Sequence, residues 1–411
     1  MTVLDAPAAP TAYGSSRLLA GVAGGARADL PTHRRHHPQP GYRSQRALAD
    51  DAAAVRLLGR GGAAFPVATK LLAVSPGPSV EVVVNGSESE PASLKDRTLM
   101  TLAPHLVLDG ALLVARALGT RQVTIAVHDR SAHDSLVRAL GERLASEPHR
   151  ERVAVVVQPG RFVAGEVRAV LNGLAGRAAV PSGRRVHASE RGLNGAPTFA
   201  SNVETFAQLA LLVSTGPRGY AGVGDPAEPG TSLLTLLGDV PHPGVVEVPT
   251  GLPLDALLPG EGGPVLVGGY HGTWVRAAHG LSVSRPALRA AGVPLNAGVV
   301  ARIPVSGCPL AEVVAVSGWL AAQSAGQCGP CLFGTAAVAR DVAALLDGWP
   351  APDVATRLHA LVGRGACAHP DGTAAFVSSA LAAMPDEIAA HARGGCGRPY
   401  LGVLPLGGDV R

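Results

Sequence analysis

The sequence has few aromatic residues and almost no lysine. Phe, Trp and Tyr make up 3% of the 411 residues, so the core must be built mainly from aliphatic side chains. Of the 35 basic residues only Lys70 and Lys95 are lysines, and both lie in one short stretch. A compact ammonium and a planar guanidinium do different work. A chain that uses arginine elsewhere is therefore expected to need ammonium groups there.

Long hydrophobic runs are also absent. No segment approaches the roughly 18 uninterrupted apolar residues of a membrane-spanning helix, which argues against direct membrane insertion. The 35 basic and 31 acidic residues leave a net charge of +4, which predicts neither a nucleic-acid surface nor a polybasic membrane anchor. The N-terminus lacks the basic-then-apolar order of a signal peptide. Five cysteines, an odd number, do not indicate a secreted disulfide framework. Together these features predict a cytoplasmic protein.

The stretch from Arg56 to Arg97 holds two kinds of ligand-binding feature. Residues Gly59 to Gly62 form a loop with little side-chain bulk, so backbone N–H groups can approach a phosphate while Arg60 supplies charge. Taken alone, such a turn is often only a connection between elements. The run Glu81 to Val84 then predicts a strand, and polar groups follow at its carboxyl end, where α/β sheets bind ligands. These polar residues are Asn85, Glu88, Glu90, Lys95, Asp96 and Arg97.

The next part of the chain alternates between predicted helices and strands. Residues 105–118 are predicted to be a helix and residues 122–127 a strand. A second strand at 152–157 ends in a glycine-bearing turn before a helix at 167–174. Glu166 at the start of that helix could simply complement the helix dipole, and Asn202 could be the N-cap of a later helix. The alternation predicts an α/β domain.

The second half of the chain has a different sequence pattern. Residues 231–258 contain short β-like runs between Pro-Gly turns, and residues 264–269 would close their sheet; we assign no chemistry to this part. Beyond Cys308, aliphatic residues with a period near 3.6 predict helices at 311–325, 335–346, 353–362 and 373–384. Short connections between them predict a four-helix bundle.

Three cysteines lie in the predicted connections of this bundle. Cys328 and Cys331 form a Cys-x-x-Cys motif after the first helix, and Cys367 lies between the third and fourth helices. The pattern fits an iron–sulfur cluster, a zinc site with His369 as fourth ligand, or a redox disulfide. Cys308 is a further candidate for a fourth thiolate, whereas Cys396 is expected to contribute nothing structural.

Residues 1–45 are rich in Pro, Ala and Gly, and they predict a flexible extension. The cluster His33-Arg34-Arg35-His36-His37 has two interpretations, a metal site or a solvated basic tail, and we favour the tail.

Two motifs carry a family resemblance. GRGGAAFPxxxK from Gly59 and NGSESEPxSxKDR from Asn85 resemble the flavin and NADH site of the NADH-binding flavoprotein subunit of bacterial respiratory complex I. NAD-linked hydrogenases and formate dehydrogenases share this family, whose motifs read GRGGAGFPxGxK and NADExEPGxxKDR. The similarity extends from about Leu57 to about Leu381.

The resemblance implies a fold and a division into domains. It implies an α/β, Rossmann-like FMN- and NADH-binding domain at 46–228, a small β-grasp domain of the soluble-ligand-binding type at 229–300, and a four-helix iron–sulfur domain at 301–396. Residues 397–411 would form a tail. The implied function passes electrons from NAD(P)H through FMN to an iron–sulfur centre or a ferredoxin-like partner. The chain would belong to a hetero-oligomer, cytoplasmic and peripheral to a membrane complex. Because no Cys-rich ferredoxin-like sequence follows the helices, electrons are expected to leave through another polypeptide.

The resemblance also assigns roles to individual residues. The FMN-binding candidates are Gly59, Arg60, Gly61, Gly62, Lys70, Asn85, Glu88, Phe162, Gly165, Glu166, Ser201, Asn202 and Thr205. The NADH-binding candidates are Phe65, Glu90, Arg184 and His187. The cluster ligands are Cys328, Cys331 and Cys367, for a [4Fe–4S] or a three-iron cluster.

The chain departs from the family motifs at four positions. Ala64 replaces a Gly, Ser87 an Asp, Val167 a Glu beside the nicotinamide, and Ala325 the first cluster Cys. Two rival functions stay open, and these changes favour only the first of them. One is a binding or assembly role that keeps the fold but not NADH oxidation. The other is the reverse direction, in which reduced ferredoxin supplies a flavin that reduces NAD(P)+.

Overall fold

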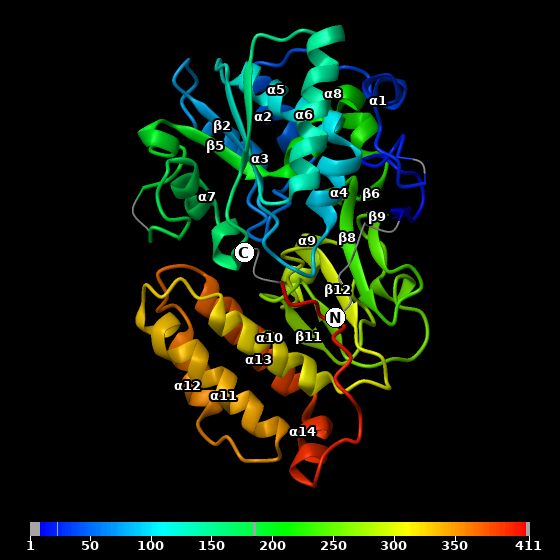
Figure 1. Cartoon of the computed structure of the whole chain (residues 1–411). Coiled ribbons are helices and arrows are strands. Elements are labelled where there is room, and N and C mark those ends of the chain that lie inside the picture. Colours follow the sequence, from blue (N-terminus) through cyan, green and yellow to red (C-terminus); the bar gives the residue numbers. More distant parts are fainter. Residues whose placement is uncertain (1–8, 23, 184–185, 408–411) are drawn as a thin grey trace.

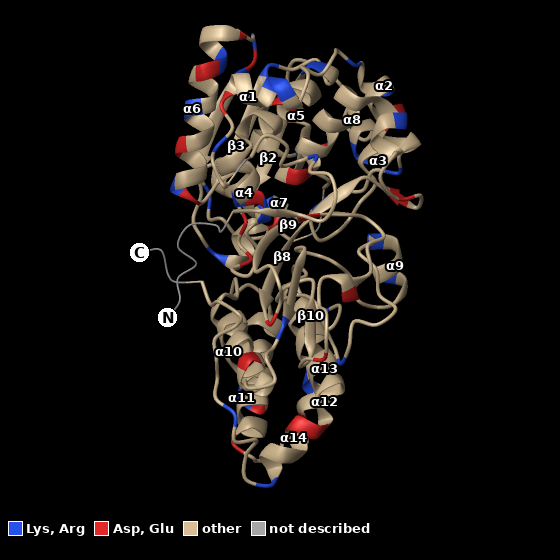
Figure 2. Cartoon of the chain, turned by 90° about the vertical axis from the view of Figure 1, so that its right-hand side faces the viewer, with Lys and Arg blue, Asp and Glu red and all other residues tan. Residues whose placement is uncertain are grey.

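The computed structural model describes residues 9–22, 24–183 and 186–407. An α/β region forms one end of the molecule, helices α10 to α14 form the other, and a six-stranded sheet lies between them (Figure 1). Charged residues of both signs are interspersed along the chain, for example on α6 (Figure 2). Among the described residues no single helix is long and apolar enough to span a membrane; α4 and α5, bent by 94°, pass that test only when they are joined.

The α/β region is built on a four-stranded parallel sheet. Its strands are β2 (Glu81–Gly86), β3 (Gln122–Val127), β4 (Arg152–Val157) and β5 (Thr198–Asn202), in the order β4-β3-β2-β5. The chain moves outward from β2 through β3 to β4 and then returns to the other side of β2 as β5. The strand order therefore reverses between β2 and β5, where Asn85 pairs with Asn202. Open α/β sheets bind ligands at such a switch point.

Helices cover both faces of this sheet because alternate residues of a strand point to opposite sides. Val82 and Val84 pack into one apolar core with helices α5 (Pro104–Ala117) and α8 (Val203–Ala221). Val83 packs on the other side with α7 (Val167–Leu174). The remaining helices of this region are α2 (Gln45–Ala54), α3 (Val67–Leu72), α4 (Lys95–Leu102) and α6 (Arg130–Ser146).

Close packing of α5 against α8 depends on one glycine. A Cβ atom at Gly110 would lie 1.9 Å from the backbone oxygen of Phe206, a distance that no side chain can occupy. The absence of a side chain at this position lets the two helix backbones meet.

The six-stranded sheet has the order β1-β9-β8-β12-β10-β11. Its members are β1 (Thr11–Ala12), β8 (Thr231–Gly238), β9 (Gly244–Pro249), β10 (Val265–Val267), β11 (Thr273–Val275) and β12 (Val299–Arg302). A short hairpin of β6 (Gly224–Asp225) and β7 (Glu228–Pro229) precedes it, and α9 (Arg285–Ala290) lies between β11 and β12. This sheet links the α/β region to the C-terminal helices.

The C-terminal helices are α10 (Pro309–Ala322), α11 (Thr335–Leu346), α12 (Val354–Leu361), α13 (His369–Ala383) and α14 (Pro385–Ala392). Their apolar core includes Val313, Val316, Val342 and Phe376, and it continues into the sheet through Trp274. The sequence predicted four of these helices within a few residues of their observed ends and missed α14.

The prediction of a flexible, solvated N-terminal extension is wrong from residue 9 onward. Helix α1 (Leu30–His36) packs on α5 and α6, and His33 and His37 are 1% and 3% exposed. Part of the cluster is therefore packed rather than solvated, although Arg35 and His36 are exposed. The His33 ring lies 2.8 Å from the Asp109 carboxylate, and the Arg34 guanidinium bonds the same group at 2.6 Å.

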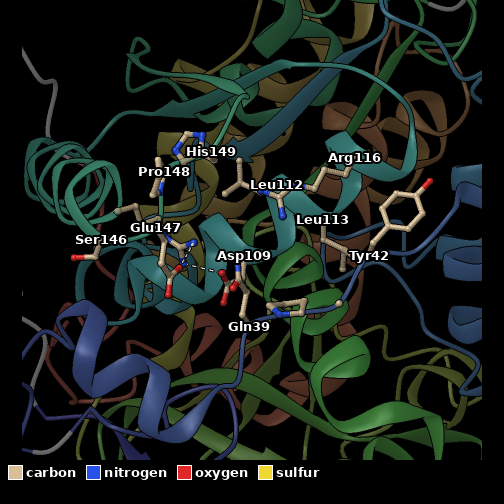
Figure 3. A pocket seen from close by; sticks show the side chains of 13 residues that line it. Gln39, Tyr42, Asp109, Leu112, Leu113, Arg116, Ser146, Glu147, Pro148 and His149 are labelled. Carbon is tan, nitrogen blue, oxygen red and sulfur yellow. Dashed lines mark hydrogen bonds and ion pairs between the residues drawn. The ribbon is translucent and has the colours of Figure 1, made fainter.

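A buried ion-pair network therefore fixes the N-terminal segment. Arg34 also pairs with Glu147 at 2.7 Å, and Arg143 reaches Asp109 at 2.7 Å. Asp109 and Glu147 lie at the edge of a cavity of about 320 Å³, with Tyr42 on its other side (Figure 3). The sequence could not predict this network because Asp109 lies 34 residues from Arg143 and 75 from Arg34, and Glu147 lies 113 residues from Arg34.

Candidate functional site

A cavity of about 730 Å³ opens at the β2–β5 switch point. Its wall combines the glycine loop at 59–62, the residues that follow β2, the turn before α7 and the end of β5. Residues 268, 271, 296 and 297 from the six-stranded sheet region and residues 367–372 at the start of α13 complete it. Most of the residues predicted to bind FMN thus lie around one space. They are Gly59, Arg60, Gly61, Gly62, Lys70, Asn85, Glu88, Phe162, Gly165, Glu166, Ser201 and Asn202.

Two hydrogen bonds hold the first two residues of the glycine loop in place. The Gly59 amide donates to the Phe65 carbonyl at 2.9 Å, and the Arg60 amide donates to the Thr205 hydroxyl at 2.9 Å. Ala64 has φ +45°, a left-handed conformation that favours glycine, the residue the family motif has there. Residue 64 adopts this conformation although it is an alanine.

Two of the predicted FMN ligands have a different role. Arg60 was expected to supply charge to the cavity, but its guanidinium is fully buried and lies 2.6 Å from Glu228. Thr205 is also fully buried and is absent from the cavity wall, because its hydroxyl accepts the Arg60 amide. The hydrogen bond of Thr205 and the ion pair of Arg60 thus hold the glycine loop in position.

Lys70 and Ser87 present unused polar groups. The Lys70 ammonium lines the cavity without a hydrogen bond or ion pair to any described residue, and burial lowers its pKa to about 8. The buried Ser87 hydroxyl, also in the wall, has no partner among the described residues. Lys70 is partly buried, and its ammonium lies 5.9 Å from the centroid of the Phe199 ring. Buried polar groups are normally paired, so the Ser87 hydroxyl is an exception within this wall.

Three of the predicted FMN ligands form hydrogen bonds to the backbone of the protein: Asn85, Glu88 and Asn202. The Asn85 amide donates to the Gly165 carbonyl at 2.9 Å, which ties the turn before α7 to β2. The Glu88 carboxylate accepts the Arg97 amide at 2.8 Å and so caps α4. Asn202 is the N-cap of α8, accepting the Glu204 amide at 3.0 Å, as the interpretation without a ligand predicted.

Glu166 is likewise a helix cap. Its Oε2 accepts the Arg168 amide at 3.0 Å and the Ala169 amide at 3.2 Å at the start of α7. Burial raises its pKa although these amides oppose the shift. The carboxylate remains in the cavity wall.

The four NADH candidates divide into three groups. Phe65 and Glu90 line the cavity, and Phe65 is 51% exposed. His187 is exposed and lies outside the cavity wall, so the structure does not bring it to the site. Arg184 lies outside the described residues. Burial raises the pKa of Glu90 to about 8, and its Oε2 accepts the Tyr270 amide at 2.9 Å.

The contribution of the six-stranded sheet was not predicted from the sequence. His271 and Asn296 reach the cavity from a segment to which no chemistry was assigned. Gly268 and Gly269 both have positive φ after β10, so this pair was the available signal of a sharp turn at a strand end. His271 packs against Phe162 at 4.7 Å between ring centroids.

The three predicted cluster cysteines come together next to this cavity. Burial raises the pKa of Cys331, and the nearby thiols of Cys328 and Cys367 add to the rise, so the three are neighbours. Cys367 itself lines the cavity. A cysteine set of this kind suits an iron–sulfur cluster.

Neither His369 nor Cys308 is placed to act as a fourth ligand beside the three cysteines. His369 donates from Nε2 to the Leu320 carbonyl at 2.9 Å and accepts from His271 at Nδ1, so neither ring nitrogen is available. Cys308 lies at the opposite end of the 14-residue helix α10, about 21 Å from the Cys-x-x-Cys loop at a rise of 1.5 Å per residue.

Comparison with known proteins agrees with this architecture. The family model of the Nuo51 FMN-binding domain matches residues 52–211, and that of the NADH-ubiquinone oxidoreductase-F iron-sulfur binding region matches residues 312–391. The F subunit of NADH-quinone oxidoreductase of Mycobacterium bovis is 29% identical over 90% of this chain and 92% of its own length. The F subunit of the same enzyme of Streptomyces coelicolor is also 29% identical, with 89% of each chain covered.

A solved structure shares the fold. The NAD+-reducing [NiFe]-hydrogenase in its air-oxidised state superimposes with a TM-score of 0.80 at 25% identity, over 93% of this chain and 68% of the hydrogenase chain. The flavin-domain and iron–sulfur matches contain the glycine loop and the three cysteines respectively. The chain therefore belongs to the family of NADH-oxidising flavoprotein subunits that includes the F subunit of NADH-quinone oxidoreductase.

Proposed function

We propose that the cavity between β2 and β5 holds FMN and receives NAD(P)H beside it, and that electrons leave towards Cys328, Cys331 and Cys367. One observation carries this proposal. The glycine loop and Cys367 line the same cavity, so a flavin in it would lie next to a cluster on the three thiols. Bound FMN would supply the chemistry, because it accepts a hydride and releases electrons singly.

The polar groups of the wall support specific roles. The glycine loop offers backbone N–H groups, and Lys70 offers an ammonium that no described carboxylate pairs, unlike that of Lys95. These groups suit the phosphate, the only part of FMN that is anionic at neutral pH. Ser87 and Ser201 offer hydroxyls for the remaining polar groups of the ligand.

The nicotinamide side of the cavity is less polar than the family motif implies. Val167 stands where the motif has a second Glu. Burial raises the pKa of Glu90 to about 8, so its carboxyl group is mostly protonated at neutral pH. A neutral carboxylic acid can donate a hydrogen bond to a carboxamide without repelling the phosphates of a dinucleotide. Phe65, half exposed at the cavity mouth, offers a face for stacking.

We infer a cluster with three cysteine ligands. Ala325 supplies no donor, so the set fits a three-iron cluster or a four-iron cluster with one non-cysteine ligand. Iron content and electron paramagnetic resonance of the purified protein distinguish these two forms.

The remaining inferences concern architecture and setting. We assign the six-stranded sheet to the β-grasp type and α10 to α13 to a four-helix bundle. We place the chain in a cytoplasmic assembly that passes electrons to a ferredoxin-like or other iron–sulfur partner, at the periphery of a membrane complex.

Anaerobic titration with NADH and with NADPH tests the proposal directly. We expect protein purified without oxygen to carry flavin absorbance that one of the two nucleotides bleaches. A flavin that neither nucleotide bleaches would favour the non-catalytic rival. Bleaching only by reduced ferredoxin would favour the reverse direction. A colourless protein that cannot be reconstituted with FMN would overturn the proposal.

A further inference from the structure

Four side chains with metal-binding donor atoms converge at the end of the helical region away from the FMN cavity. They are Cys308, Glu387, His391 and Cys396, and one donor atom from each lies within 4.8 Å of all the others. Cys308 is 1% exposed, Glu387 7% and His391 9%, whereas Cys396 is partly exposed, so the cluster is largely shielded from solvent. None of the four belongs to the cavity wall.

Helix geometry positions these groups. Cys308 is the N-cap of α10, and its sulfur accepts the Ala311 amide at 3.4 Å, a contact that favours a thiolate. Glu387 and His391 are four residues apart on α14, so they lie on one face of the helix. Cys396 follows α14 in the chain.

The hydrogen bonds of His391 leave a lone pair inside the cluster. Its Nδ1 lies 2.7 Å from the Leu346 carbonyl, so Nδ1 must carry a proton that it donates. In neutral histidine Nε2 is then unprotonated, yet it faces the Cys308 sulfur and a Glu387 oxygen, each at 3.3 Å. A lone pair facing a carboxylate is repulsive, and either a proton on Nε2 or a metal ion between the two groups would remove that repulsion. The same Nδ1–H to carbonyl bond is what orients histidines that bind metals through Nε2.

The charges of the cluster also balance around a divalent cation. Two thiolates and one carboxylate sum to −3, and the other oxygen of Glu387 is paired with Arg398. A divalent ion and Arg398 together supply +3, so the closed cluster would be neutral. Without the ion, the single S–H of Cys308 faces two acceptors, a Glu387 oxygen and the His391 Nε2.

We propose that Cys308, Glu387, His391 and Cys396 bind a structural zinc ion. The donor set of two sulfurs, one imidazole nitrogen and one carboxylate oxygen suits four-coordinate zinc, and four protein ligands leave no open position for a substrate. The site is separate from the iron–sulfur site, because α10 lies between the two. Cys308 and Cys396 also fall outside the matched iron–sulfur region, 312–391.

The zinc ion would fasten the C-terminal segment to α10. The Cys308 amide donates to the Pro399 carbonyl at 2.8 Å, and Glu312 accepts backbone amides from residues 401, 403 and 404. The segment then reaches Tyr270, whose hydroxyl donates to the Pro405 carbonyl at 2.5 Å. Tyr270 is also the backbone partner of Glu90, so the fastened segment supports one wall of the cavity.

Metal analysis of paired variants tests the proposal. Zinc and iron are measured by mass spectrometry on intact protein purified without chelator, for the wild type, Cys396→Ser and Cys367→Ser. We expect about one zinc per wild-type chain. Cys396→Ser should lose most of the zinc and keep its iron, whereas Cys367→Ser should lose iron and keep zinc. Zinc that is unchanged in Cys396→Ser would overturn the proposal.

Cobalt substitution provides a second test if Cys396→Ser does not fold. Wild-type protein stripped of zinc and given Co²⁺ under reducing conditions should show thiolate-to-cobalt charge-transfer bands and the strong visible bands of tetrahedral cobalt. Protein that takes up neither Zn²⁺ nor Co²⁺ would contradict the site. A disulfide between Cys308 and Cys396 in freshly prepared, reductant-treated protein would also contradict it.

Discussion

The two lysines of the chain occupy opposite electrostatic environments. The Lys95 ammonium is buried between Asp96 at 2.8 Å and Glu204 at 3.2 Å, so it belongs to an internal ion-pair network. Both lysines line the cavity, but the Lys70 ammonium has no acidic partner among the described residues. The same residue type therefore has a structural role at one position and, by our proposal, a ligand-binding role at the other.

Lys70→Met should weaken FMN binding about 10- to 100-fold, because it removes one charge-assisted contact of about 1.5–3 kcal/mol. Fluorescence titration of the apoprotein measures the affinity. Riboflavin, which lacks the phosphate, should bind both proteins equally. A parallel loss of riboflavin affinity would show that Lys70 acts through the cavity shape instead.

Lys95→Met is the matched control. It leaves the buried Asp96 carboxylate without its cation and Glu204 with only the Arg60 guanidinium at 3.9 Å, so the free energy of unfolding should fall by about 3–5 kcal/mol. Lys70→Met should not destabilise the apoprotein in this way. Denaturant unfolding of the three proteins makes the comparison, and equal destabilisation by both substitutions would contradict the assigned roles.

The low pKa of Lys70 predicts a pH dependence of FMN binding. Burial lowers this pKa to about 8 in the ligand-free protein, so the ammonium is present below pH 8 and is lost as the pH rises through that value. FMN affinity should therefore fall above about pH 8 in the wild type. The fall should be smaller in Lys70→Met, and an identical pH profile in the two proteins would argue against an ammonium–phosphate contact.

Glu90 should make the protein less stable as the pH rises from about 4.5 to about 8. Burial raises its folded-state pKa to about 8, so the folded state retains a proton that the unfolded state has already released. Glu90→Gln removes this titration while keeping the shape of the side chain. The melting temperature of the variant, relative to that of the wild type, should increase between about pH 4.5 and about pH 8. If the two melting temperatures change in parallel with pH, the raised pKa of Glu90 is contradicted.

At the scale of elements, helix α8 holds the glycine loop. Thr205 lies in the first turn of α8, and its buried hydroxyl accepts the Arg60 amide at 2.9 Å. The Arg60 guanidinium is meanwhile held by Glu228 of β7. The loop that we propose for the flavin is thus fixed by two elements that do not touch the ligand.

Thr205→Val should loosen this loop and lower FMN affinity. The isosteric change leaves a buried amide without an acceptor, at a cost of about 1–3 kcal/mol in stability. Thr205→Ser retains the hydroxyl and should restore both stability and affinity, measured by thermal melting and flavin titration. A Thr205→Ser variant as impaired as Thr205→Val would point to the methyl group rather than the hydrogen bond.

Helix α1 shows how one carboxylate can fix an element. Burial opposes ionisation of Asp109, but hydrogen bonds from Arg34 and His33 and the charge of Arg143 hold its pKa well below the usual range. Asp109→Asn should therefore cost about 3–5 kcal/mol, because the buried Arg143 guanidinium loses its partner at 2.7 Å and keeps only Glu147 at 3.8 Å. Limited proteolysis should then cut the N-terminal segment first. Unchanged resistance there would contradict this role for Asp109.

At the scale of the whole molecule, one cavity joins three structural parts. The α/β region, the segment around β10 and the start of α13 all contribute to its wall. A ligand in this cavity contacts each part, and it stabilises the folded state by mass action. FMN at 100 times its dissociation constant should add about 2.7 kcal/mol to the stability. Calorimetry should show the α/β and helical regions melting together at a higher temperature; a shift confined to one of two transitions would contradict this coupling.

Much of the fold followed from the local sequence pattern. Strands β3 and β4 and helices α7 and α11 have the predicted ends, because their apolar periodicity and flanking turns are local signals. The glycine loop, Asn85 and the three cysteines were placed at the site by motif. The side chains of Arg60 and Thr205 bond within the protein, which the motif could not show because a motif names a residue but not the direction of its side chain.

The sequence by itself determined the element types, the family motifs and the aliphatic core, since each depends on neighbouring residues or on composition. Only the tertiary structure decided that Lys70 lacks an acidic partner among the described residues, that α1 is buried against Asp109, and that Cys308 and Cys396 share a cluster with Glu387 and His391. Those facts depend on contacts between residues far apart in the chain. Such contacts form only when the packed elements bring their side chains together, and no local pattern encodes them.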